Sequence, residues 1–141
     1  MKTAVDTNVF SALWSNEPGA SEMIVLLGQA RSQGCVVICA AVYAELLAHP
    51  KAGTAFVDDF LRDTGVTIEF DLDEAIWRGV ARVYAAYAQR RRRSGSTEAK
   101  RLLVDFLIGA HAMHRADRLL TLDASRYVKD FPRLKLAPVI K

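Results

Sequence analysis

Short apolar runs alternate with helical patterns along this chain, and the alternation limits the possible folds more than any other feature. Ala4–Val5 and Leu119–Leu122 each predict a short strand, and the β-branched run Val36–Cys39 is typical of a strand buried on both faces. Val66–Phe70 alternates in polarity and predicts a strand near a sheet edge, and Leu134–Val139 predicts a last strand. The chain therefore carries several strands separated by other elements.

Between these predicted strands, apolar residues recur at the spacing of an α-helix. We predict helices from about Pro18 to Gly34, Ala41 to Ala48, around Phe56–Leu61 as far as Gly65, from Asp71 or Asp73 to Arg90–Arg93, and from about Glu98 to Ala116. The last of these is apolar almost all round and should be buried centrally. The order of elements predicts a single α/β domain over residues 1–141, built as a three-layer α/β/α sandwich around a mainly parallel sheet.

Composition excludes several other classes of protein. With 51% hydrophobic and 25% charged residues, this chain of 141 residues is too apolar to be disordered. The longest apolar run, Cys35 to Ala44, has ten residues, about half of what a membrane span needs. The first residues reach Asp6 before a signal-peptide segment can build. We expect no membrane attachment and a cytoplasmic protein.

Four acidic residues interrupt segments that are otherwise apolar: Asp6, Glu45, Asp105 and Asp123. Asp6 and Asp123 follow predicted strands, whose carboxyl ends form the ligand-binding edge of an open α/β sheet. The other two lie on helices that must pack on that sheet, so all four can converge. A buried carboxylate needs a partner, and we expect no equal set of buried cations to supply one. A bound cation is the natural substitute.

Carboxylate ligands favour Mg²⁺ or Mn²⁺ over zinc. Such a site can activate a water and stabilise an in-line phosphoryl displacement, which predicts phosphodiester hydrolysis. Taken singly, each acid also has a structural interpretation, as a helix cap, a half-exposed helix residue or a turn residue. A zinc site made of Cys35, Cys39, His111 and His114 is a less favoured alternative, because these residues lie in apolar stretches and are interpreted as core.

The remaining charge is basic. Without the four acids, 19 Lys and Arg stand against 12 acidic residues, a difference of +7. The segment 78–101 holds eight basic residues and one acid, and it includes the run Arg90, Arg91, Arg92, Arg93. Such a segment is typical of phosphate contact with little sequence information, although a solvated helix end is an equal alternative.

Four motifs resemble those of the PIN-domain ribonucleases, and among them the small VapC-like toxins of bacterial toxin–antitoxin pairs. They are VDTNV, AELLA, DFLIGAHA and LLTLD, in the family's order, with successive acids 39, 60 and 18 positions apart. The resemblance implies that Asp6, Glu45, Asp105 and Asp123 bind Mg²⁺ or Mn²⁺ and carry the catalysis, supported by Asn8 and Thr121. Asp117 competes with Asp123 for the fourth role.

The same resemblance implies an endoribonuclease that inhibits translation, a homodimer, and a cognate antitoxin whose C-terminal segment lies over the active site. One alternative is a non-catalytic module that binds RNA or protein through segment 78–101. A phosphotransfer enzyme of the haloacid-dehalogenase or receiver type is disfavoured. The first would need an acid where the chain has Asn8, and the second an acidic pair before its phosphorylated residue.

Overall fold

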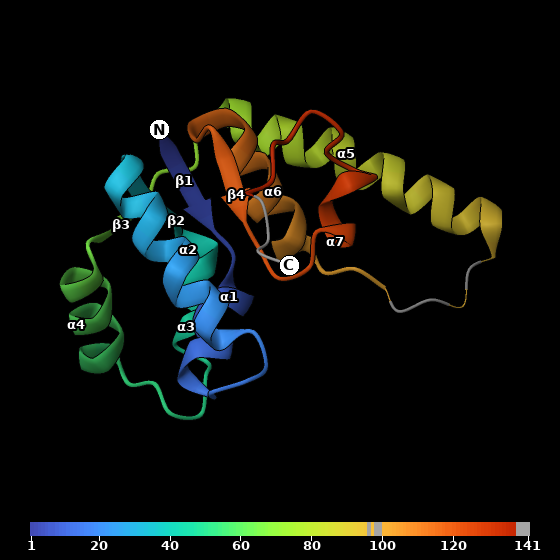
Figure 1. Ribbon diagram of the computed structural model, residues 1–141. Helices are drawn as coiled ribbons and strands as arrows, with labels where there is room; N and C mark the ends of the chain where they lie inside the picture. The colour runs from blue at the N-terminus through green and yellow to red at the C-terminus, as the bar shows by residue number, and fades with distance from the viewer. Residues whose placement is uncertain (96, 98–99, 138–141) are drawn as a thin grey trace.

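A four-stranded parallel sheet forms the centre of the computed structural model, which describes residues 1–95, 97 and 100–137 (Figure 1). The strands run in the order β3-β2-β1-β4, and each neighbouring pair is parallel. Their bounds are Lys2–Val5 for β1, Cys35–Cys39 for β2, Val66–Glu69 for β3 and Arg118–Leu120 for β4. These positions confirm four of the five predicted strands, including the placement of β3 at an edge.

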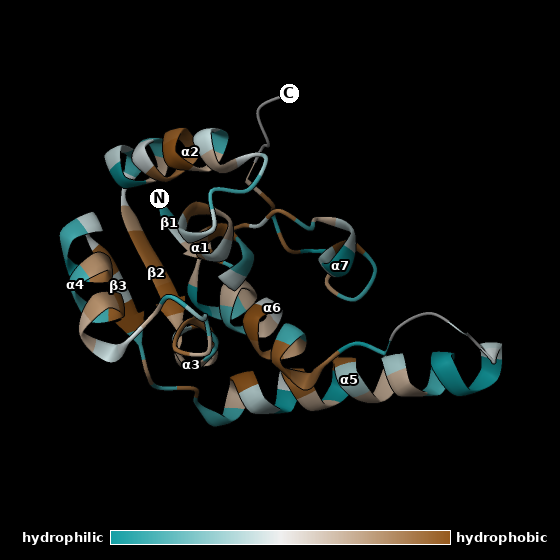
Figure 2. Cartoon of the chain, turned by 90° about the horizontal axis from the view of Figure 1, so that it is seen from below, coloured by the Kyte–Doolittle hydropathy of each residue, from teal (hydrophilic) through white to brown (hydrophobic). Residues whose placement is uncertain are grey.

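Helices cover both faces of this sheet. They are α1 (Thr7–Trp14), α2 (Ala20–Gln33), α3 (Ala40–Leu46), α4 (Thr54–Thr64), α5 (Glu74–Ser94), α6 (Leu103–Arg115) and α7 (Ser125–Val128). In Figure 2 the sheet lies between α1 and α2 on one side and α5 and α6 on the other, with α4 beside β3. Buried Phe10, Ile38 and Phe106 join these layers in one hydrophobic cluster. The predicted α/β/α sandwich is confirmed.

Local chemistry explains where several helices begin and end. Asp73, rather than Asp71, caps α5, because its side chain accepts a hydrogen bond from Ile76 N at 3.1 Å. Gly65 ends α4 with a φ of +74°, a left-handed conformation that favours glycine. These ends agree with the boundaries expected from the sequence.

Three predictions of elements need correction. Helix α1, which begins directly at the Asp6 cap, was not predicted as a helical stretch. Helix α6 begins at Leu103, several residues later than expected, because Arg101 N donates to the Tyr87 hydroxyl at 2.8 Å in a non-helical connection. Its central burial therefore applies to residues 106–112, while Leu103 is exposed.

No helix in the described part of the chain is long and apolar enough to span a membrane.

The predicted last strand is reduced to a single parallel bridge between Leu136 and Leu119 in its described part. Residues 138 and 139 of that prediction, and residues 98 and 99 of the predicted start of the α6 helix, lie outside the described residues. The sheet is therefore extended next to β4 by one bridged residue rather than by a full strand.

The zinc alternative is not supported. Cys39 is buried as expected, but Cys35 is exposed, so the interpretation of both cysteines as core residues is wrong for Cys35. His111 is buried and its Nε2 lies 2.8 Å from Glu69 Oε1, while Lys2 Nζ donates to Glu69 Oε2 at 2.7 Å. His111 is thus a core histidine with a satisfied partner.

This network predicts acid sensitivity. Burial lowers the pKa of His111 from its ordinary value of 6.5, and the opposing effect of Glu69 does not offset it. Burial would raise the pKa of Glu69, yet hydrogen bonds from Lys2 and His111 bring it below its usual value. Both groups bind protons less readily in the folded than in the unfolded chain, so acidification below pH 6.5 costs folding free energy.

We expect the melting temperature to fall more steeply between about pH 7.5 and pH 5 in the wild type than in His111→Gln, which lacks the titrating imidazole. Glu45 and Asp105, whose raised pKa values act in the opposite direction, are present in both proteins and cancel in the comparison. A steeper fall in His111→Gln would contradict this assignment.

Candidate active site

The predicted site residues come from the carboxyl ends of β1 and β4 and from two helices, α3 and α6. The strand order reverses between these two neighbours, and such switch points are where open α/β sheets bind ligands. Asp6 directly follows β1 and Thr121 directly follows β4, and the two ends are joined by Asp6 N donating to Leu120 O at 2.9 Å. Glu45 lies near the end of α3, and Asp105 lies in the first turn of α6.

Asp6 is the most buried of the four acids, with 2% of its surface exposed. Its Oδ1 accepts from Thr7 N at 2.7 Å, which caps α1. Its Oδ2 accepts from Thr121 Oγ1 at 2.8 Å and from the Tyr127 hydroxyl at 2.7 Å. Burial and the charge of Asp6 raise the pKa of Tyr127, so this hydroxyl remains a donor. Asp6 is therefore both a helix cap and a rigidly oriented carboxylate.

Asn8 and Thr121 connect the first and last of the four acids. Asn8 Nδ2 donates to Thr121 Oγ1 at 3.3 Å, and Asn8 Oδ1 accepts from Leu122 N at 3.1 Å. Thr121 Oγ1 also accepts from Asp123 N at 3.1 Å while it donates to Asp6. The loop after β4 is thus tied to the loop after β1, which is consistent with the supporting role expected of both residues.

Glu45 and Asp105 are partly buried, and their electrostatics couple them to Asp6. Thr7 Oγ1 donates to Glu45 Oε1 at 2.5 Å, a contact that the sequence did not predict. Burial raises the pKa of Glu45, and the charges of Asp6 and Asp105 raise it further. Burial also raises the pKa of Asp105, which Arg126 opposes and Asp6 reinforces. These carboxylates are close enough to repel one another.

Arg126 is the main residue that the sequence analysis missed. Its Nη1 lies 3.3 Å from Asp105 Oδ1, and its Nε lies 3.3 Å from Asp123 Oδ2. Two of the four acids thus have a nearby cation, although a single guanidinium is not an equal set of cations for four acids. The spacing of three residues between Asp123 and Arg126 was a possible signal, but it requires a helix there, and α7 has only four residues.

The donor set fits a hard divalent cation in its chemistry. Four carboxylates face one paired guanidinium among the described residues, which leaves a formal charge of −3. Carboxylate oxygens are the ligands that Mg²⁺ and Mn²⁺ prefer. In the observed side-chain positions, however, no group of three or more His, Cys, Asp or Glu in the described part is arranged to hold a metal. Two of the four acids instead contact Arg126.

Asp117 lies away from the acid cluster, by which we mean Asp6, Glu45, Asp105 and Asp123. Its Oδ2 accepts from Lys2 N at 2.6 Å, and its own N–H donates to Lys2 O at 2.8 Å. Lys2 is the first residue of β1, at the end opposite to Asp6. Asp123, rather than Asp117, is the acid that joins the cluster.

The arginine run occupies the last turns of α5, which extends beyond the rest of the molecule in Figures 1 and 2. Arg90 pairs with Asp130, whose side chain is 3% exposed. Arg92 and Arg93 are exposed at the hydrophilic end of the helix. Arg90 therefore has a structural partner, and RNA binding by the run stays a prediction.

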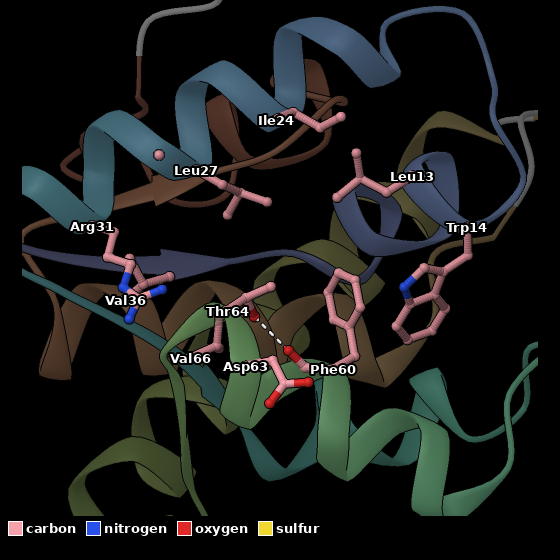
Figure 3. Close-up of a pocket in the computed structure, with 11 residues that line it drawn as sticks. Leu13, Trp14, Ile24, Leu27, Arg31, Val36, Phe60, Asp63, Thr64 and Val66 are labelled. Carbon is pink, nitrogen blue, oxygen red and sulfur yellow. Dashed lines mark hydrogen bonds between the residues drawn. The ribbon is translucent and has the colours of Figure 1, made fainter.

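A mainly apolar hollow of about 490 Å³ lies between α1, α2 and α4 (Figure 3). Leu13, Leu27 and Phe60 are among the side chains that line it, and none of the four acids does. Trp14 also lines it, and its indole N–H is buried without an acceptor in the described structure. This surface is a candidate for protein contact rather than for phosphodiester chemistry.

Fold and site together define a class of protein, an α/β/α domain in which Asp6 follows a central strand and acts electrostatically on the acids Glu45 and Asp105 of two helices. The family model of the PIN domain matches residues 3–132, so the chain belongs to the PIN domain family, whose members are generally nucleases. The family resemblance inferred from the motifs is thereby confirmed. A search of curated proteins found no match.

Two solved structures share the fold. A chain of VapBC2 from Rickettsia felis, bound to a DNA fragment from the promoter, has 20% identity and a TM-score of 0.66, with 99% of this chain and 100% of that chain covered. A chain of VapBC-1 from nontypeable Haemophilus influenzae has 20% identity and a TM-score of 0.62, with 97% of each chain covered.

Proposed function

We propose that this protein is an Mg²⁺- or Mn²⁺-dependent endoribonuclease, and that it is the VapC-like toxin of a toxin–antitoxin pair that inhibits translation in the cytoplasm. One observation supports the proposal above the others: the charges of Asp6 and Asp105 act on Glu45, and Arg126 pairs with both Asp105 and Asp123. Membership of the PIN domain family supports nuclease chemistry at this edge.

In this proposal Asp6, Glu45, Asp105 and Asp123 hold the cation. A bound divalent ion would help to activate a water and stabilise the charge that develops on the phosphate. The chain's own residues fix the carboxylates beforehand. Hydroxyls of Thr121 and Tyr127 orient Asp6, and the Thr7 hydroxyl orients Glu45. This preorganisation is favourable because Asp6 and Glu45 do not have to be ordered during the reaction.

The substrate in this proposal is RNA, bound partly through the arginine run of α5. Arg91, Arg92 and Arg93 lie beyond the ion pair of Arg90, at the hydrophilic end of the helix, where they can contact phosphates. Contacts of this kind add affinity with little sequence information.

The partner in this proposal is a cognate antitoxin, and the protein itself forms a homodimer. VapBC assemblies among the matching structures support the first expectation. The antitoxin's apolar segment would fill the hollow between α1, α2 and α4, where Ile24 is 62% exposed and the Trp14 N–H has no acceptor among the described residues. Helix α1 is about 12 Å long and connects this hollow to Thr7, so the segment can continue over the carboxylates.

The deciding experiment is cleavage of total RNA by purified protein freed of any partner, with Mn²⁺ or with EDTA. We expect metal-dependent fragments with 5′-phosphate and 3′-hydroxyl ends, and none from an Asp105→Asn control. Addition of the antitoxin should suppress the cleavage. Cyclic 2′,3′-phosphate ends would contradict the proposed chemistry. Unchanged function in Asp105→Asn, together with loss on replacing the arginine run, would favour a non-catalytic binding module.

A further inference from the structure

We propose that Arg126 is an internal counter-ion that competes with the divalent cation for Asp105 and Asp123, so that metal binding must displace it. The proposal rests on the proposed function and concerns how the negative charge of its site is balanced in the metal-free protein. It follows from two ion pairs, both at 3.3 Å, that one guanidinium makes with two of the four acids.

The residues before and after Arg126 in helix α7 are both hydrogen-bonded to acids of the cluster. Ser125 Oγ donates to Asp123 Oδ1 at 2.7 Å, and the neighbouring Tyr127 hydroxyl donates to Asp6 Oδ2 at 2.7 Å. Tyr127 is 1% exposed, so this short helix is anchored in the core next to the site. The guanidinium therefore lies among the carboxylates because its neighbours are fixed there, not because a free side chain happens to reach them.

The arrangement explains why the described side chains do not yet form a metal site. A guanidinium and a divalent cation repel each other, and in the proposed site both would bind the carboxylates of Asp105 and Asp123. While Arg126 occupies these oxygens, no three acids are arranged around one point. Displacement of Arg126 would free two ligands at once.

Arg126 is also able to leave. Its side chain is 38% exposed, so its charged end lies close to solvent and regains hydration when it moves there. Both of its ion pairs are longer than the 2.7–2.9 Å of a strong charge-assisted hydrogen bond. Partly exposed pairs of this kind each contribute a factor of about five or less to an equilibrium constant. Arg126 thus balances the acids without blocking a divalent cation completely.

The test is isothermal titration of metal-free protein with Mn²⁺ alone, in the wild type, Arg126→Gln and Arg101→Gln. We expect Arg126→Gln to bind Mn²⁺ about tenfold more tightly, because two competing pairs are removed. Arg101→Gln is the matched control. Arg101 also acts on Asp105 through its charge, but its side chain contacts Asp130 Oδ2 at 4.0 Å and donates to Ser125 O at 3.4 Å rather than to one of the four acids. Its effect should stay within about twofold.

A second measurement separates competition from a purely structural role. In EDTA, Arg126→Gln should melt at a lower temperature than the wild type, because its carboxylates lose their counter-charge. In saturating Mn²⁺ this difference should disappear or reverse. Arg126→Lys, which keeps the charge but loses the fork that reaches both acids, should bind Mn²⁺ with intermediate affinity.

Several outcomes would overturn the proposal. They are weaker or unchanged Mn²⁺ binding by Arg126→Gln, an equal gain in Arg101→Gln, and a destabilisation of Arg126→Gln that Mn²⁺ does not remove. If the wild type binds Mn²⁺ and Asp6→Asn does not, a failure of this kind leaves the proposed function intact. If neither the wild type nor Arg126→Gln binds Mn²⁺, the proposed metal dependence fails as well.

Discussion

Replacement of Asp6 by asparagine is expected to lower RNA cleavage by more than about 100-fold, because changes to mere supporting residues of metal sites already cost 10- to 100-fold. Asp6 is the carboxylate on which the site converges, since it accepts hydrogen bonds from Thr7, Thr121 and Tyr127. Asparagine keeps the shape but removes one negative charge and one acceptor oxygen. The measurement is the initial rate of RNA cleavage in Mn²⁺.

The fold should survive this change. The Tyr127 hydroxyl can reverse and accept from the new amide, and removal of one charge relieves repulsion with Glu45 and Asp105. Asp117→Asn is the matched control, because Asp117 bonds to Lys2 at the opposite end of β1. Wild-type rates from a folded Asp6→Asn protein would show that the acids have no part in cleavage.

Millimolar Mg²⁺ or Mn²⁺ is expected to raise the melting temperature by about 10 °C when the ion is at 100 times its dissociation constant. Ligand binding at that level stabilises a folded protein by about 2.7 kcal/mol, and about 3–4 °C per kcal/mol applies to a chain of this size. The physical reason is the charge of the cluster, in which burial and mutual repulsion raise the pKa values of Glu45 and Asp105. A cation removes that repulsion.

Thermal melting with and without EDTA measures this effect. Asp6→Asn should reduce the rise, because one ligand is lost, whereas Asp117→Asn should leave it unchanged. NaCl at equal ionic strength controls for screening. A melting curve that divalent ions do not move would argue that the four acids do not share a cation.

Much of the fold could be predicted from particular residues. The β-branched run Val36–Cys39 became the inner strand β2, and the alternating segment Val66–Phe70 became the edge strand β3. Helix α1 was missed because only eight residues, capped by Asp6, carry its pattern. The start of α6 depended on a contact between Arg101 and Tyr87, which a local pattern does not contain.

For the site, the four acids were predicted because each interrupts an apolar segment, and Asn8 and Thr121 because the motifs surround them; their roles in a site stay predictions. Thr7, Arg126 and Tyr127 were missed, since a threonine in a first turn and an arginine in a short helix have no distinctive local pattern. Their roles depend on partners between 21 and 121 residues away along the chain.

The sequence by itself determined the order of strands and helices, the acids that interrupt them and the motifs of the PIN domain family, because these depend on periodicity and residue type along the chain. Only the tertiary structure decided that Asp123 joins the site while Asp117 lies at the opposite end of β1. Only it placed Arg126 between Asp105 and Asp123. These outcomes follow from the pairing of β1 with β4, which brings distant segments together and cannot be obtained from local patterns.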